Sequence, residues 1–263
     1  MENTYWHKQQ QEKPLYPELL WSRPENRLSA GKLLIMGGNL HSFAVAAESF
    51  DQVTKSGIGT ARVVLPSALQ RTVGKIFKEG EYAPSTPSGS FSKLALSTII
   101  DASDWADGVL IAGDLGRNAE TAILLETLLQ KSSIPVVITQ DAVDYISSTP
   151  QTAIQRKNIA LVLSLSQLQR LVITLKYKHA VTFSMDLLRL TEWLHEFTLT
   201  YPIHIVTEHN NVILVAVNGE VSTTRLIEET PIWRVKTASK MTVWWLQNMD
   251  KPFQAFTTAV VAP

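Results

Sequence analysis

The sequence predicts an α/β fold in which helices cover both faces of a mostly parallel sheet. Short aliphatic or β-branched runs alternate with longer helical segments from Gly31 onward, and Gly, Pro, Asn or Asp marks each transition. That alternation is typical of βαβ units. The short runs are apolar along their whole length, as strands buried on both faces are. Towards the C-terminus, Asn218-Gly219 separates two such runs and indicates a type I′ turn, so an antiparallel hairpin extension of the sheet is expected.

Each element is predicted from its apolar pattern and from the turn residues that bound it. Continuous apolar runs predict strands, in chain order at 32–36, 61–65, 108–112, 135–139, 159–163, 203–207, 212–217 and 221–226. Apolar residues at helical spacing predict helices, in chain order at 43–55, 94–102, 118–130, 166–177, 186–200, 238–246 and 254–261. The helix over 118–130 has the clearest signals, because Asn118 suits an N-cap and Glu120 lies in the first turn. The segment 79–91 is rich in Pro, Ser and Gly and is predicted to be a loop.

The chain is expected to consist of an N-terminal extension, residues 1–30, and a single domain, residues 31–263. Residues 1–12 are polar and form no signal peptide, and no apolar run approaches the roughly 20 residues that span a bilayer. The absence of cysteine excludes disulfides, thiolate metal sites and cysteine nucleophiles, and it fits a reducing compartment. We expect a cytoplasmic protein without a membrane partner, and we expect it to form a homo-oligomer.

Charge and motif content limit the classes of function. The chain has 24 basic and 24 acidic residues, so its net charge is zero. Proteins that bind nucleic acid through phosphate contacts need clustered Lys and Arg, so no nucleic-acid partner is expected. The six histidines never occur at the spacing of metal ligands, and no metal site is expected. The sequence also lacks the G-x-G-x-x-G motif, the P-loop and the G-x-S-x-G nucleophile elbow.

Three predicted strand ends carry residues that could bind a small molecule. Ligands of open α/β sheets bind at the carboxyl ends of the strands, where helix N-termini offer free amides. The candidate substrate-binding residues at these ends are Gly38, Asn39, His41, Gly113, Asp114, Gly116 and Asp141. The alternative is that they build tight turns or cap helices, with Asp114 and Asn118 capping the helix over 118–130 and Asp141 beginning another.

The motifs, taken in order, resemble one family. Gly31-Lys-Leu-Leu-Ile-Met-Gly-Gly-Asn39 is similar to a Gly-x-(apolar)₃-Gly-Gly-Ser motif, and Val63-Val-Leu-Pro66 is similar to the strand end that follows it. Ala112-Gly-Asp-Leu-Gly116 is similar to a Gly-Pro-Gly-Leu-Gly turn, and Val137-Ile-Thr-Gln-Asp-Ala-Val143 to Val-Leu-Asp-Ala-Asp-Ala-Leu. This order resembles the ribokinase-like superfamily, most closely its ADP/ATP-dependent NAD(P)H-hydrate dehydratases, the C-terminal domain of bifunctional nicotinamide-nucleotide repair enzymes. The resemblance runs from about Gly31 to the C-terminus and implies a three-layer α/β/α sandwich.

The resemblance also implies ligands and site residues. Members of the family are lyases that use ADP or ATP to dehydrate hydrated NADH or NADPH. The implied ligands are therefore ADP or ATP, and NADH, NADPH or their hydrates. The family's nucleotide-binding positions resemble Glu208, Asn218, Ser239 and Lys240 in this chain.

Departures from the family pattern concern catalysis. Ser164-Leu-Ser-Gln167 stands where the family has Thr-Pro-His-x-x-Glu, and Glu208 stands near its Lys-Gly turn, where a negative charge repels phosphate. Thr237-Ala-Ser-Lys240 resembles in place the family's Gly-Thr-Gly-Asp, a helix N-terminus that supplies the anion hole and the catalytic acid. Lys240 cannot act as the base unless its pKa falls by several units, which leaves Asp114 or Asp141 as the fallback.

These departures favour one hypothesis and leave others open. The favoured hypothesis is a divergent, catalytically impaired NAD(P)H-hydrate dehydratase-like protein that binds a nucleotide or dinucleotide. The alternatives are an active ADP/ATP-dependent dehydratase with altered catalytic residues and a non-catalytic interaction subunit. A sugar or vitamin kinase is less favoured, because it needs the same missing Asp.

Overall fold

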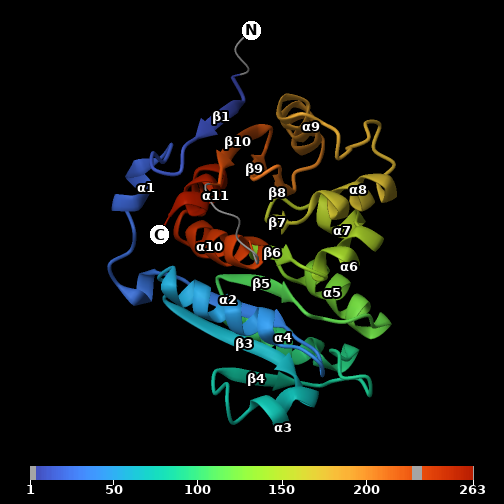
Figure 1. The fold of residues 1–263 in the computed structure, drawn as a ribbon. Helices are drawn as coiled ribbons and strands as arrows, with labels where there is room; N and C mark the ends of the chain where they lie inside the picture. The colour runs from blue at the N-terminus through green and yellow to red at the C-terminus, as the bar shows by residue number, and fades with distance from the viewer. Residues whose placement is uncertain (1–3, 227–232, 263) are drawn as a thin grey trace.

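The computed structural model describes residues 4–226 and 233–262, which form a sheet between two layers of helices (Figure 1). The described strands are β1 (Trp6–Gln9), β2 (Lys32–Gly37), β3 (Thr60–Pro66), β4 (Gly80–Ala83), β5 (Gly108–Gly113), β6 (Val136–Thr139), β7 (Ile159–Val162), β8 (His204–His209), β9 (Val212–Val217) and β10 (Glu220–Arg225). The described α-helices are α1 (Pro17–Trp21), α2 (Ala44–Lys55), α3 (Gln70–Val73), α4 (Leu96–Trp105), α5 (Ala119–Lys131), α6 (Ala142–Ser148), α7 (Gln151–Ile154), α8 (Leu165–Thr174), α9 (Leu187–Thr200), α10 (Trp233–Gln247) and α11 (Pro252–Val261). None of these helices has both the length and the apolar character needed to cross a membrane.

The strands lie in the order β1-β10-β9-β8-β7-β6-β5-β2-β3-β4. Every pairing from β8 to β4 is parallel, as the alternation of strands and helices predicts. β9 is antiparallel to both β8 and β10. Asn218 and Gly219, between β9 and β10, have φ angles of 49° and 84°, as a type I′ turn requires. The predicted hairpin extension is therefore confirmed.

Side chains that alternate along a strand belong to two separate cores. In β2, Leu34 and Met36 pack in one core, whereas Leu33 and Ile35 pack in the other. The first core is covered by α4, α5, α6, α7, α8 and α9, and the second by α1, α2, α3, α10 and α11. The sheet is thus apolar on both faces, and the predicted three-layer α/β/α sandwich is confirmed.

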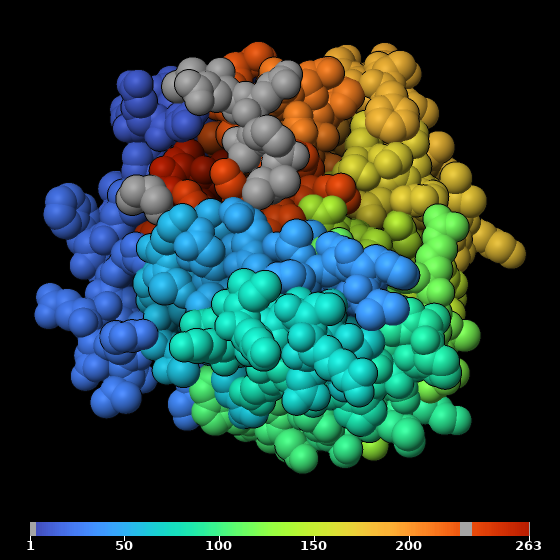
Figure 2. All heavy atoms as spheres, turned by 60° about the horizontal axis from the view of Figure 1, so that its bottom comes forward, coloured from blue at the N-terminus to red at the C-terminus, as the bar shows by residue number. Residues whose placement is uncertain are grey.

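Short and polar elements escaped the sequence analysis. The segment predicted to be a loop, 79–91, contains β4, whose Glu81 pairs with Arg62 of β3 near one edge of the sheet. Figure 2 shows the residues of α2, α3 and β4, in blue to teal, on the face beside this edge. β1, with the sequence Trp-His-Lys-Gln, pairs with β10 at the opposite edge. Edge strands are only partly covered, so neither strand has the apolar run that reveals a buried one.

The two C-terminal helices begin earlier than predicted. α10 begins at Trp233 instead of residue 238, and α11 begins at Pro252, which was expected to separate the two helices. Proline suits the first turn of a helix, because the amide that it lacks has no partner within the helix there. The earlier start of α10 changes which of its residues face the ends of the strands.

Candidate functional site

The carboxyl ends of β2, β5 and β6 meet, as predicted from the sequence. The Gly38 amide donates a hydrogen bond to the Gly113 carbonyl at 2.9 Å. Gly113 has a φ of +113°, and a Cβ at this position would lie 2.5 Å from Gln140 Cβ and 3.0 Å from Asp141 Oδ1. Gly38, Gly113 and Asp141 therefore lie together at the carboxyl ends of the central strands.

Gly113→Ala is expected to lower the free energy of unfolding by about 2–3 kcal/mol. The new methyl group would lie too close to Gln140 Cβ, and the backbone would keep a φ that side chains disfavour. Gly31→Ala is the matched control, because its φ is +88° but its nearest contact would be 3.4 Å away. We expect only about 1 kcal/mol of loss there. Urea denaturation measures both variants, and equal losses would contradict the close approach at Gly113.

The carboxylate of Asp114 is engaged by the start of α2. Ser42 Oγ donates to Asp114 Oδ2 at 2.5 Å, and the Val45 amide donates to the same oxygen at 3.3 Å. The negative charge is also favourable beside the positive end of the helix dipole. Asn118 caps α5 as predicted, by accepting from the Glu120 amide at 2.8 Å. Asp114, however, caps the neighbouring helix α2 and not α5.

Only one of the two carboxylate oxygens of Asp141 accepts a hydrogen bond from the described residues. Its Oδ2 accepts from the Gly116 amide at 3.1 Å, while its Oδ1 is buried and has no hydrogen-bond partner among the described residues. Burial raises the pKa of Asp141, the backbone amides oppose this, and the nearby Asp114 raises it further. α6 begins directly after Asp141, but the side chain does not cap it. A carboxyl group with a raised pKa can exchange a proton closer to neutral pH, so Asp141 suits acid–base chemistry.

The segment 84–92, after β4, lies against the carboxyl ends of these strands. The Leu40 amide donates to the Gly89 carbonyl at 2.9 Å, and Asn118 Nδ2 donates to Ser88 Oγ at 3.0 Å. These bonds connect the segment to the turn after β2 and to the start of α5. The polar groups near the strand ends are thus partly satisfied by the protein itself.

Two further predicted residues, Gly116 and His41, lie around this cluster. The hydroxyl of Tyr145 donates to the Gly116 carbonyl at 2.5 Å. Tyr145 was not selected in the sequence analysis. His41 is exposed, and its backbone amide donates to the Asn39 side chain at 2.8 Å. Asn39 in turn donates through Nδ2 to the Asp114 carbonyl at 2.5 Å. Asn39 therefore joins the cluster through its side chain, whereas Gly116 and His41 join it through their backbone groups.

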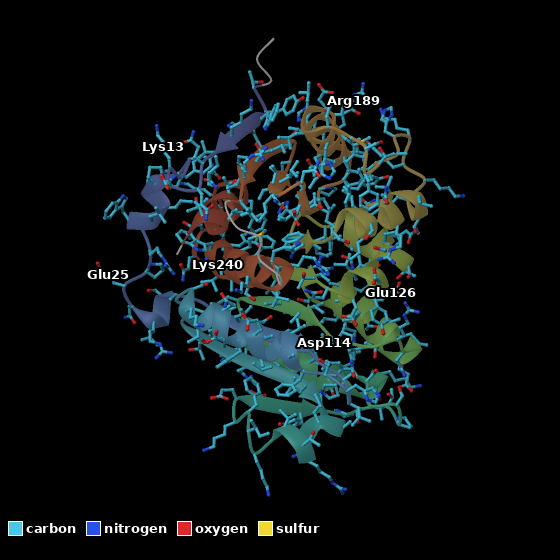
Figure 3. All side chains as sticks on the ribbon, in the orientation of Figure 1. Lys13, Glu25, Asp114, Glu126, Arg189 and Lys240 are labelled. Atoms are coloured by element: carbon cyan, nitrogen blue, oxygen red, sulfur yellow. The ribbon has the colours of Figure 1, made fainter. Side chains whose placement is uncertain are left out.

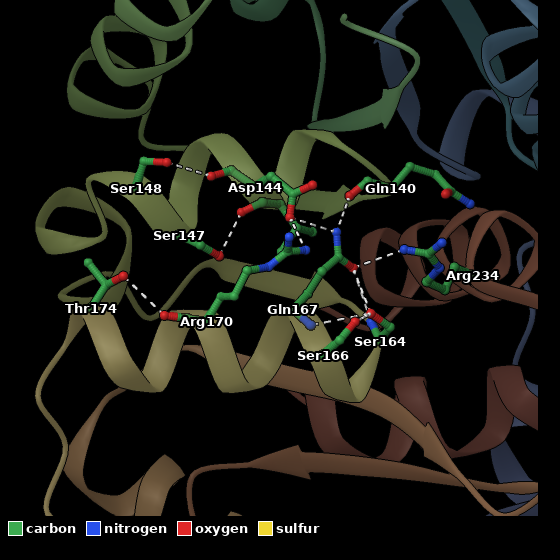
Figure 4. A network of polar contacts seen from close by, with 11 residues as sticks. Gln140, Asp144, Ser147, Ser148, Ser164, Ser166, Gln167, Arg170, Thr174 and Arg234 are labelled. Carbon is green, nitrogen blue, oxygen red and sulfur yellow. Dashed lines mark hydrogen bonds and ion pairs between the residues drawn. The ribbon is translucent and has the colours of Figure 1, made fainter. Parts of the chain in front are cut away.

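Arg234, in the first turn of α10, reaches the same edge and was also missed. Its Nη1 donates to Gln167 Oε1 at 2.9 Å, and Gln167 Nε2 donates to the Gln140 carbonyl at 2.7 Å (Figure 4). Burial lowers the pKa of Arg234, and the charges of Asp144 and Asp141 act in the opposite direction. A guanidinium group therefore stands near Asp141 where α10 begins. Arg234 was missed because this helix was expected to begin at residue 238, after the arginine.

Ser239 and Lys240 do not lie at a helix N-terminus. Because α10 begins at Trp233, the segment Thr237-Ala-Ser-Lys240 lies inside the helix, where backbone amides already have partners. Ser239 is fully buried, and Lys240 Nζ donates to the Ala262 carbonyl at 2.6 Å. Figure 3 labels Lys240 on α10 and Asp114 on a different part of the molecule. The expectation that this segment begins a helix is wrong, because the apolar pattern placed the start of α10 too late.

Glu208 and Asn218 lie near opposite ends of β9. Glu208 is near the carboxyl end of β8, where its Oε1 accepts from the Asn211 amide at 3.1 Å. β9 then runs back across the sheet, and beside Asn218 the Gly219 amide donates to Thr198 Oγ1 at 3.1 Å. A strand of this length spans about 20 Å. Antiparallel β9 therefore separates Glu208 from Asn218, and their part in a nucleotide site stays a prediction.

A pocket of about 240 Å³ opens beside Lys240, between the β9–β10 hairpin and the C-terminal helices. It is lined by Gln52, Ile213, Leu226, Trp233, Lys236, Thr237, Lys240, Ala259 and Val260. Burial lowers the pKa of Lys240, and the charge of Lys236, one helical turn away, lowers it further. None of the described lining residues is acidic. The pocket therefore places two cationic side chains beside an indole ring.

The architecture is shared with solved structures of other proteins. A ribokinase-like superfamily protein from Enterococcus faecalis superposes with a TM-score of 0.72 over 99% of this chain and 86% of its own, at 15% sequence identity. This chain has the ribokinase-like fold. The expectation drawn from the order of the sequence motifs is thus confirmed for the fold.

Two ribokinase-like enzymes from Bacillus subtilis are also similar in structure. The ADP/ATP-dependent NAD(P)H-hydrate dehydratase, co-crystallised with ATP and Mg²⁺, has a TM-score of 0.61 and 13% identity over 94% of this chain and 86% of its own. Pyridoxal kinase, in an ADP complex, has a TM-score of 0.55 and 12% identity over 87% and 88% of the two chains. No protein-family model matches the sequence, and no curated protein matches it significantly. Within residues 4–226 and 233–262, no three His, Asp or Glu side chains are grouped to hold a metal ion.

Proposed function

We propose that this ribokinase-like protein binds an adenine nucleotide or a nicotinamide dinucleotide and is a catalytically impaired relative of the NAD(P)H-hydrate dehydratases. The observation that carries the proposal is the start of α10, where the described first turn contains Arg234 and no acidic residue. The family resemblance implies a catalytic carboxylate at a helix start of this kind. A guanidinium group cannot accept a proton at neutral pH, so Arg234 cannot take over that role.

The pocket beside Lys240 supports nucleotide binding. Lys236 and Lys240 suit the negative charge of phosphate groups, and Trp233 offers an aromatic face to a base. Its volume of about 240 Å³ is below the roughly 300–1,000 Å³ of typical ligand pockets, so it would hold only part of a nucleotide. The dehydratase and the kinase of similar fold were crystallised with ATP and ADP, respectively, which makes an adenine nucleotide the first ligand to test.

A second candidate function is an active dehydratase in which Asp141 replaces the missing carboxylate. The observation that favours it is the buried Oδ1 of Asp141, which has no described partner, together with a pKa raised by burial. Asp114 is a weaker candidate, because the start of α2 already holds its carboxylate. The two candidate functions differ in turnover but share the requirement for a bound nucleotide.

We expect ADP, ATP, NADH or NADPH to raise the melting temperature of the protein. A ligand at 100 times its dissociation constant adds about 2.7 kcal/mol of stability, which corresponds to about 5–10 °C for a domain of this size. For ADP and ATP, the double variant Lys236→Gln with Lys240→Gln should abolish the shift, because it removes both cations of the pocket.

The matched control for this experiment is Lys178→Gln, which removes an exposed charge outside the pocket and should keep the shift. Absence of a shift with all four ligands would contradict nucleotide binding. A full ADP shift in the double variant would contradict the assignment to this pocket.

A further inference from the structure

A cavity of about 900 Å³ lies between α5 and α6, on the face of the sheet opposite α10. We name it the α5–α6 groove. Its walls include Arg117, Ala119, Ala122, Ile123, Glu126 and Tyr145. Gly116 and Asp141 of the strand-end cluster also line the groove, whereas the pocket beside Lys240, the proposed nucleotide site, shares none of its residues.

One face of α5 presents a small apolar surface to the α5–α6 groove. Ala119, Ala122 and Ile123 recur at the spacing that places residues on one side of a helix. Ile123 is 55% exposed, although the next residue of α5, Leu124, is buried in the core. A protruding isoleucine beside two alanines is a projection beside a hollow, which is the arrangement that lets two helices interlock.

The same face carries opposite charges at its two ends. Arg117 lies just before α5, and Glu126, labelled in Figure 3, lies nine residues further along, about 13 Å on the helix axis. Neither residue forms an ion pair with another described residue. The groove is lined by three acidic residues and two arginines, so its charge pattern does not suit a simple anion; they are Glu126, Asp141, Asp144, Arg117 and Arg170.

We propose that the α5–α6 groove receives α5 of a second copy of this chain in a two-fold symmetric dimer. With the two α5 helices antiparallel, Arg117 of each copy meets Glu126 of the other, so two complementary charge pairs form. Ile123 of each copy then packs over Ala119 and Ala122 of its partner. Such self-complementarity is the property that an isologous interface requires. The expectation of a homo-oligomer, drawn at first from the sequence, thereby acquires a defined surface.

The mass of the full chain in solution tests the proposal, with size-exclusion chromatography and light scattering from about 1 to 100 µM. We expect a dimer, and we expect Ile123→Glu to raise its dissociation constant at least tenfold. Ile123 is exposed, so this variant should keep the circular dichroism spectrum of the parent chain. Lys78→Glu, an exposed charge change on a different face, is the control and should leave the dimer intact.

Charge reversal tests the antiparallel pairing itself. Arg117→Glu and Glu126→Arg each place like charges together twice, so each variant alone should dissociate at least tenfold more readily. A mixture of the two variants restores both attractive pairs and should form a heterodimer. A monomer at every concentration would overturn the proposal and leave the groove to a small molecule or a different protein. A dimer insensitive to these substitutions, or a mixture that stays monomeric, would overturn it as well.

Discussion

The purified protein is expected to restore NADH from hydrated NADH, with ADP or ATP present, at least about 100-fold more slowly than the Bacillus subtilis dehydratase assayed beside it. Loss of one general acid–base group typically costs a factor of about 10² to 10⁴. The first turn of α10 offers Arg234 in this chain, and its guanidinium is held by Gln167. Recovery of NADH absorbance measures the rate directly.

Three variants separate the explanations for a slow or a normal rate. Arg234→Asp restores a carboxylate to the start of α10 and should raise the rate at least tenfold. Arg234→Asn is the matched control, because it removes the guanidinium without supplying a carboxylate and should give no rescue. If the unaltered protein works at the dehydratase's rate, catalytic impairment is contradicted. If that activity then disappears in Asp141→Asn, the result supports Asp141 as the base.

Acidification from pH 7.5 to 5 is expected to remove about 2 kcal/mol of stability through one residue, His204. His204 is buried between Trp245 and Phe256, with ring centroids 5.4 and 5.7 Å away, and burial lowers its pKa from 6.5 to about 4. Between these two values the unfolded chain binds a proton that the folded chain does not. The contribution is therefore complete above pH 6.5 and is lost as the pH falls towards 4, by about 3 kcal/mol in total.

His204→Leu should flatten this part of the pH profile, because the side chain no longer takes up a proton on unfolding. Urea denaturation at several pH values gives the slope for both proteins. His41→Leu, at an exposed position, is the control and should keep the slope of the unaltered chain. An unchanged slope in His204→Leu would show that other groups cause the loss.

The central strands could be predicted because each is buried on both faces and therefore apolar throughout. In β5 and β7, for example, no residue has a polar side chain. β1 and β4 could not be found in the same way, because edge strands keep polar side chains in contact with water. Their positions are decided by pairing with β10 and β3, which a local pattern does not encode.

The strand-end part of the candidate site was predictable for a topological reason. Parallel strands end at one edge, so Gly38, Gly113 and Asp141 had to be neighbours once the sheet was inferred. The side-chain partners were not predictable, since Ser42 and the Asp114 that it contacts are 72 residues apart. Arg234 was missed for a simpler reason: the first turn of α10 carries polar residues that interrupt the apolar pattern.

The pairing of β1 with β10 affects how the chain is made. Trp6 and Thr223, which share a side-chain hydrogen bond, are separated by 217 residues. Gln9 also donates to the carbonyl of Thr257, on α11, at 2.7 Å. On the ribosome, β1 therefore has no partner in the sheet until β10 has been translated. Its polar sequence suits that delay, because an unpaired Trp-His-Lys-Gln segment is less prone to aggregate than an apolar strand.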